Sequence, residues 1–114
     1  MNDLRFPQDP AFRALRAGDL DGYHRAIADH EVVDFSGDDL RGTDFRKADV
    51  RRVVLRDAYL RDADLRGCDL RHIDLEGASI QGAKISGAYF PANLSAEEIQ
   101  LSLQHGTRLR TRKT

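Results

Sequence analysis

Residues 63–77 read ADLRG, CDLRH and IDLEG, three units of five residues with a leucine at each centre. The same spacing continues in both directions, because every fifth position from 35 to 90 is apolar. This central column consists of Phe35, Leu40, Phe45, Val50, Leu55, Leu60, Leu65, Leu70, Leu75, Ile80, Ile85 and Phe90. A period of five matches neither the α-helical turn of about 3.6 residues nor the coiled-coil repeat of about 3.5. The column therefore excludes a helical bundle as the main architecture.

A second column lies two residues before the first, and apart from Asp38 and Thr43 its members are small or apolar. We expect these two polar side chains to bond to amides of an N-terminal cap. Side chains two apart share one face of an extended segment, so both columns point inward. A period of five reverses this alternation unless the backbone turns between units, so each unit must end in a corner. Glycine, which tolerates positive φ, often stands two residues after the centre: Gly37, Gly42, Gly67, Gly77, Gly82 and Gly87.

The large β-branched members of the second column are Val33, Val53 and Ile73, which recur every twenty residues. Four units to one coil would stack these three side chains directly above one another. Twelve units over residues 33–92 then make about three coils, each separated from the next by the spacing of neighbouring strands.

Units such as Ala63-Asp64-Leu65-Arg66-Gly67 and Cys68-Asp69-Leu70-Arg71-His72 resemble the pentapeptide-repeat family, and the pattern runs through residues 33–92 without an insertion. The resemblance implies a mainly β fold, a right-handed quadrilateral β-helix with the two columns inside and the other three positions facing water. We expect residues 1–32 to form an N-terminal helical cap, 33–92 the β-helix of twelve repeats in three coils, and 93–114 a capping helix with a basic tail.

Capping signals place short α-helices at both ends, where a repeat array must cover its apolar ends. Asp9 before Pro10 and Asp19 each begin a helix, and residues 95–98 form a capping box before a helix that Gly106 ends. On that last helix Leu101 points away from Ile99, so either the tail covers it or a second copy does. Leu101 is therefore a candidate dimer contact, and a homodimer through the C-terminal helix is one expected state.

Many of the central residues have an acidic residue on one side and an arginine on the other. An acid often precedes the centre and an arginine often follows it, which we call the charge grid: Asp34, Asp39, Asp44, Asp49, Asp64, Asp69 and Asp74 with Arg41, Arg46, Arg51, Arg56, Arg61, Arg66 and Arg71. We expect a solvated, self-neutralising surface. Val54 and Tyr59 replace two of the acids, and together with Arg56 and Arg61 they form a candidate contact for an unidentified protein partner.

The net charge is −1, and residues 33–92 hold 10 basic and 11 acidic side chains. Neither a strongly basic nucleic-acid-binding domain nor a strongly acidic mimic of nucleic acid fits this balance. The tail carries Arg108, Arg110, Arg112 and Lys113 without an acid among them. We interpret it as a solvated, frayed terminus, with a phosphate-binding arm for nucleic acid as the alternative.

Residues with the spacing of a reaction site do not emerge from the sequence. Cys68 occupies the inward second column as a buried spacer, and the four histidines lack ligand spacing. We therefore assign no catalytic, cofactor-binding or metal-binding residues and expect no cofactor. The single cysteine excludes a disulfide within the chain, and neither a signal peptide nor an apolar run of membrane-spanning length is present, so we expect a cytoplasmic protein without a membrane partner.

The favoured function is a non-catalytic scaffold or protein–protein interaction module. The family resemblance supplies an alternative, because some long members look like B-form DNA and bind type II topoisomerases, protecting them from quinolones. Near-neutral coils and a short length argue against that alternative here. A second alternative is contact of the basic tail with nucleic acid, which predicts strong salt dependence and loss on truncation after Gly106.

Overall fold

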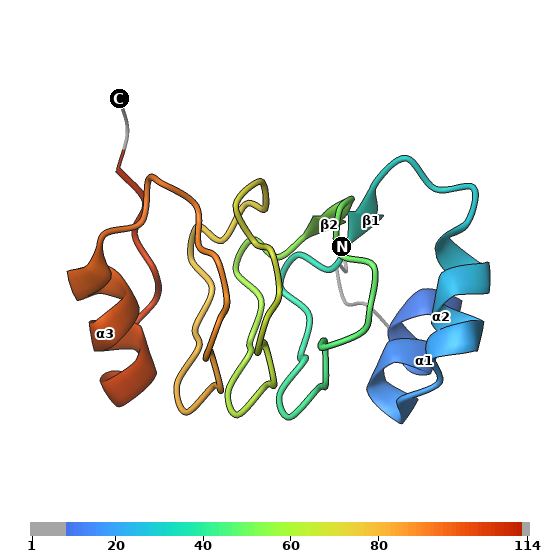
Figure 1. Cartoon of the computed structure of the whole chain (residues 1–114), viewed down its shortest axis with the longest axis horizontal. Coiled ribbons are helices and arrows are strands. Elements are labelled where there is room, and N and C mark those ends of the chain that lie inside the picture. Colours follow the sequence, from blue (N-terminus) through green and yellow to red (C-terminus); the bar gives the residue numbers. More distant parts are fainter. Residues whose placement is uncertain (1–8, 113–114) are drawn as a thin grey trace, which may run out of the picture.

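A computed structural model of the chain describes residues 9–112. Two helices, α1 (Pro10–Ala17) and α2 (Leu20–Ile27), pack together at one end, and α3 (Ala96–His105) lies at the other. The chain between them winds in coils that lie side by side (Figure 1). Within residues 9–112 no helix combines the length and the apolar character needed to cross a membrane.

Neighbouring coils are joined by parallel pairing between residues twenty apart in the sequence. Strands β1 (Val33–Asp34) and β2 (Val53–Val54) pair with Val33 opposite Val53. The same register continues through isolated parallel bridges, which are Asp39–Tyr59, Asp44–Asp64, Tyr59–Ser79, Asp64–Lys84 and Asp69–Tyr89. The twenty-residue stacking predicted from Val33 and Val53 is therefore confirmed.

Among the described residues regular strand is limited to β1 and β2, so the expected mainly β character is found only in part. The reason is the short distance between corners, which leaves about one ladder position on each straight segment. The pairing is nevertheless well formed. Leu65 N donates to Lys84 O at 2.8 Å, and Lys84 N donates back to Ala63 O at 2.9 Å.

The two columns face inward as predicted. Central residues from Phe35 to Ile80 are buried, and Ala58, Ala63 and Ala78 of the second column are completely covered. Near the C-terminal end Ile85 and Phe90 are half-buried. The corner glycines have φ between 70° and 78°, and Asp57 and Asp62 take the same left-handed conformation with φ of 61°.

The N-terminal helices close the first coil with side chains. Asp9 accepts hydrogen bonds from the first amides of α1, and Asp19 accepts one from Gly22 N. The buried Tyr23 donates its hydroxyl to Asp49 O at 2.8 Å, and Asp49 N donates to His24 Nε2 at 3.1 Å. These bonds satisfy polar groups on the edge of the first coil that no preceding coil covers.

Thr43, one of the two polar members of the second column, finds a different partner from the one expected. Asp38 and Thr43 were predicted to bond to amides of the N-terminal cap, but the partner of Thr43 Oγ1 is the guanidinium of Arg16 at 3.0 Å. Arg16 also donates to Arg41 O. The cap presents side chains to the coil because α1 and Asp9 already use its amides.

The C-terminal helix covers part of the last coil. Ser95 accepts from Glu98 N at 3.1 Å to begin α3, and Gly106 ends the helix with φ of 71°. The predicted capping box is only half formed, because the Glu98 carboxylate binds Arg110 of the tail. Edge amides of the last coil donate to this cap: Ile80 N to Ser102 Oγ, Gly82 N to Leu103 O and Gly77 N to Leu109 O.

The tail is docked as far as residue 112, so the prediction of a frayed terminus is wrong. Leu109 is 0% exposed, and its N and O bond to Ala78 O and Gly77 N at 2.8 Å each. Thr111 donates twice to the Glu76 carboxylate. The tail does not cover Leu101, which stays 40% exposed, because the apolar side chain that it buries is its own Leu109.

We predict that Gly77→Ala destabilises the protein more than Gly37→Ala, although both replace a corner glycine of the same stack. The left-handed φ of 78° and 71° costs any alanine about 1 kcal/mol. At Gly77 the added Cβ also overlaps the Asp57 carboxylate, whereas nothing lies within 4 Å at Gly37. Urea unfolding measures the difference, which should vanish in an Asp57→Gly background. Equal costs in the wild-type background contradict the prediction.

We predict that Leu109→Ala lowers the free energy of unfolding by about 2–4 kcal/mol, because the side chain is fully buried. Leu101→Ala, on the exposed face of the same cap, should cost less than about 1 kcal/mol. Thermal and urea unfolding of the two variants provide the measurement. A Leu109→Ala variant as stable as Leu101→Ala would mean that the tail is not docked.

Candidate interaction surface

The charge grid is built from pairs inside single repeats. In five repeats the arginine Nε and Nη2 donate to the two carboxylate oxygens of the aspartate two residues earlier, and its backbone N donates to the same side chain. These pairs are Asp39–Arg41, Asp44–Arg46, Asp49–Arg51, Asp64–Arg66 and Asp69–Arg71. The arginine hydrogen bonds hold the pKa of each carboxyl below its usual range, to about 2 for Asp39.

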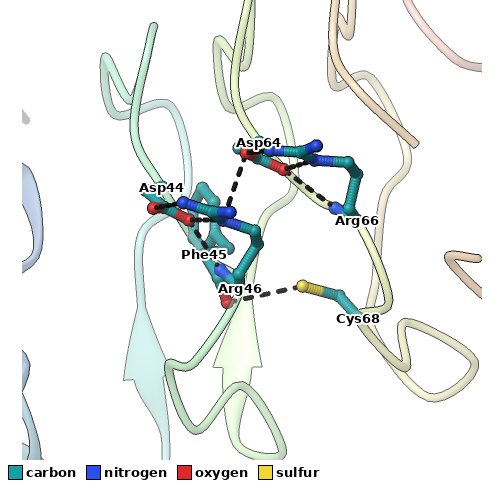
Figure 2. Close-up of polar contacts among 6 residues, drawn as sticks. All are labelled: Asp44, Phe45, Arg46, Asp64, Arg66 and Cys68. Atoms are coloured by element: carbon teal, nitrogen blue, oxygen red, sulfur yellow. Dashed lines mark hydrogen bonds and ion pairs between the residues drawn. The ribbon is translucent and has the colours of Figure 1, made fainter. Parts of the chain in front are cut away.

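Pairs also connect neighbouring coils, as Figure 2 shows. The Asp64 carboxylate accepts hydrogen bonds from Arg66 of its own repeat, and its Oδ2 lies 3.2 Å from Arg46 Nε of the preceding coil. Asp64 was expected to face water, but these two guanidinium groups leave it only 8% exposed. Bidentate bonds of this kind are stronger than neutral ones, and they set the orientation of both side chains.

The grid changes where Val54 and Tyr59 replace aspartates. Val54 is half-buried, and Arg56 of its repeat bonds to Asp74 of the next coil at 3.2 Å. Tyr59 is 43% exposed, and its backbone pairs with Asp39 of the preceding coil and Ser79 of the following one. Of the two predicted apolar contacts, Tyr59 is therefore the more accessible.

Arg61 differs from the other arginines of the grid. Six of the seven, all within the described coils, have a hydrogen bond to a carboxylate. The nearest carboxylate recorded for Arg61 is that of Asp62, whose Oδ2 lies 3.9 Å from Arg61 Nε. That distance is beyond hydrogen-bond range. Tyr59 occupies the position from which a partner aspartate would otherwise bind.

Arg108 joins this surface from the tail, which sequence reasoning missed. Its guanidinium lies 5.3 Å from the centre of the Tyr59 ring and donates to Tyr59 Oη and Gly77 O at 2.9 Å each. Tyr59 and Arg108 are 49 residues apart, and no local pattern connects them. Only the docking of Leu109 brings Arg108 to this place.

Three arginines line one depression of about 310 Å³ on this side of the coils. Its lining includes Arg41, Tyr59, Arg61, Ser79, Gln81 and Arg108. We call Tyr59, Arg61 and Arg108 the Tyr59 surface. Of the four predicted contact residues, Tyr59 and Arg61 line this depression, whereas Val54 and Arg56 belong to the preceding repeat.

The other arginines predicted to contact nucleic acid are bound to the protein. Arg110 makes two side-chain hydrogen bonds to Glu98 Oε2, the shorter at 2.6 Å. Arg112 donates through its backbone to Asn93 O and through its guanidinium to Ala92 O. Lys113 lies outside the described residues. The tail arginines therefore form contacts within the protein instead of an extended basic arm.

A second depression, of about 480 Å³, lies where the N-terminal cap meets the coils and is lined by His24, Lys47, Cys68 and His72 among others. The Cys68 thiol is buried, as predicted, and lies 3.4 Å from Phe45 O. Burial raises the pKa of this thiol to about 11, so it stays protonated and weakly nucleophilic near neutral pH. Within residues 9–112 no cluster of three metal-ligating side chains forms.

A family model of pentapeptide repeats matches residues 58–91, in eight copies. Residues 58–91 therefore belong to the pentapeptide-repeat family. No curated protein and no solved structure matches it. Pentapeptide repeats imply a quadrilateral β-helix, and the twenty-residue pairing extends this repeat geometry back to Val33, before the matched range. Family membership describes a shape and assigns no activity, so the function must be argued from the surface.

We predict that Arg66→Gln reduces the loss of stability on acidification. The pKa of Asp64 is lower in the folded protein than in an unfolded chain, so the pair stabilises the fold above the usual carboxyl pKa. This contribution decreases as the pH falls below about 4, and it is fully lost only when the pH drops through the lower pKa of the folded state. Urea midpoints at pH 7 and pH 3 should therefore differ less in the variant than in the wild type.

Arg61→Gln is the matched control, because Arg61 has no aspartate two residues before it. Its difference between the two urea midpoints should equal that of the wild type. If Arg66→Gln retained the full wild-type difference, the Asp64–Arg66 pair would not be a source of the acid sensitivity.

Proposed function

We propose that this pentapeptide-repeat protein is a non-catalytic scaffold whose three coils form a right-handed quadrilateral β-helix. In this proposal the Tyr59 surface binds another protein. The observation that carries it is the accessible Tyr59 ring, fixed by Arg108 beside the one grid arginine that lacks a hydrogen-bonded carboxylate within the described coils. Aromatic and arginine side chains are the types that contribute most to binding at protein interfaces.

Charge pairing elsewhere on the coils supports the choice of this surface. A side chain already held by two hydrogen bonds gains little from a partner, because binding must first break those bonds. Asp39, Asp44, Asp49, Asp64 and Asp69 are all in this state. The same pairing removes support from mimicry of DNA, since these carboxylates are neutralised by their own arginines.

The basic tail gives no support to nucleic-acid contact, because Arg108 and Arg110 are bound to Tyr59 and Glu98. A homodimer through α3 stays a prediction, and the exposure of Leu101 is what supports it.

The test is a pull-down from lysate of the source cells with the tagged full chain, quantified by mass spectrometry. The variant is Val54→Asp with Tyr59→Asp, which places the residue of the charge grid at both positions and so suits the fold. We expect a specific protein to be captured by the wild type and reduced about tenfold or more with the variant, the loss expected when central contacts are removed.

Val32→Asp is the matched control, because Val32 is 57% exposed but lies outside the Tyr59 surface. Capture should survive this change. Retention of every captured protein by the Val54→Asp, Tyr59→Asp variant would overturn the proposal, provided that thermal unfolding shows the variant to be folded.

A further inference from the structure

The five bidentate pairs of the charge grid show how this scaffold binds a carboxylate. In each pair the arginine is held at the position after a central residue and directs Nε and Nη2 toward the position before it. The geometry is set by the repeat backbone, and so it recurs from coil to coil. Arg61 stands on the same backbone position, between the central residue Leu60 and the corner residue Asp62.

At Arg61 the scaffold supplies the arginine without the aspartate. Tyr59 stands in place of the acid, and its neighbours in the backbone ladder are Asp39 of the preceding coil and Ser79 of the following coil. Asp39 is engaged by Arg41 at 2.7 and 2.8 Å, so it is not available to Arg61. The Arg61 side chain is 60% exposed. A carboxylate from outside can therefore reach it.

A second guanidinium is held in place nearby. Arg108 donates two of its five N–H groups, to Gly77 O and Tyr59 Oη, and these bonds hold its guanidinium 5.3 Å from the centre of the Tyr59 ring. Asp57 Oδ1 lies 3.8 Å from Arg108 Nη1, too far for a hydrogen bond. Asp57 and Asp62 thus moderate the positive charge of the surface but leave donors of both arginines available.

We propose that the Tyr59 surface recognises an acidic side chain, glutamate or aspartate, on an exposed segment of a partner protein. The carboxylate binds Arg61 as the grid aspartates bind their arginines, with Arg108 as a second donor and the Tyr59 ring as the apolar floor. This inference rests on the proposed scaffold function and specifies the chemistry of the partner. The depression of about 310 Å³ has room for one such side chain and a neighbouring residue.

Arg71 provides a built-in comparison. Like Arg108 at Tyr59, Arg71 lies 5.3 Å from the centre of a tyrosine ring, that of Tyr89, and it is also exposed. Unlike Arg61, it is bidentate to the aspartate of its own repeat, with bonds of 2.8 and 2.9 Å to Asp69. An arginine beside a tyrosine is thus common to both places, and the missing carboxylate is what distinguishes the Tyr59 surface.

The experiment follows arginine Nε–H signals by NMR in the full chain. The probe is a hexapeptide with two glutamates, and the control peptide has glutamines in their place. We expect saturable shifts of Arg61 and Arg108 with the glutamate peptide, no saturable shift with the glutamine peptide, and no shift of Arg71. Arg61→Gln should weaken binding about tenfold or more, the loss of a bidentate charge-assisted pair, whereas Arg71→Gln should leave it unchanged.

Tyr59→Asp is the second variant, and it suits the fold because aspartate occupies this position in seven other repeats. It gives Arg61 a carboxylate of its own, so the glutamate peptide should no longer shift the Arg61 signal. Equal shifts across all grid arginines, or no saturable shift at Arg61, would overturn the proposal. Tighter binding of inorganic phosphate than of the peptide would also overturn it, since the site would then favour a phosphoryl group.

These outcomes are separable from those of the pull-down. A partner that is captured through Tyr59 but competes with neither peptide leaves the scaffold function standing and removes the acidic side chain from it. Peptide binding at Arg61 without a captured protein would support recognition of an acidic side chain and remove the support for the scaffold function.

Discussion

The structure depends on backbone hydrogen bonds that run along the axis of the stack, from each coil to the one twenty residues away. Leu65 N to Lys84 O and Lys84 N to Ala63 O are representative of this ladder. Because a corner follows every short segment, each segment contributes about one such connection, and no single segment would be stable alone. The inward columns add the apolar contact that holds the segments in register, with Leu60 and Leu65 fully buried between their neighbours.

A ladder of this kind leaves polar groups at both ends, and the two caps satisfy them by different means. At the N-terminal end Tyr23, His24 and Arg16 reach the first coil with side chains. At the C-terminal end Leu103 and Leu109 accept hydrogen bonds through their carbonyl groups, in place of a further coil. The tail is therefore a structural part of the stack, which explains why a segment rich in arginine buries a leucine.

The same register places side chains of like charge above one another. Asp44 and Asp64 are paired neighbours, and their mutual repulsion is offset by Arg46, which contacts both. The surface is therefore organised by a local requirement for charge balance. Tyr59 removes one acid from that arrangement. Arg61 is then left without a hydrogen-bonded carboxylate, and Arg108 adds a second guanidinium beside the tyrosine ring.

The sequence by itself determined the five-residue period, the inward columns, the twenty-residue stacking and the residues that begin and end the helices. These features are local or strictly periodic, so they can be counted along the chain. It did not determine that Asp64 is buried, that Glu98 binds Arg110, or that Leu109 seals the last coil and brings Arg108 to Tyr59. Those contacts join residues of different coils or involve an aperiodic tail, so they cannot be counted along the chain. The tail makes its contacts because the last coil leaves unsatisfied edge groups for it to cover.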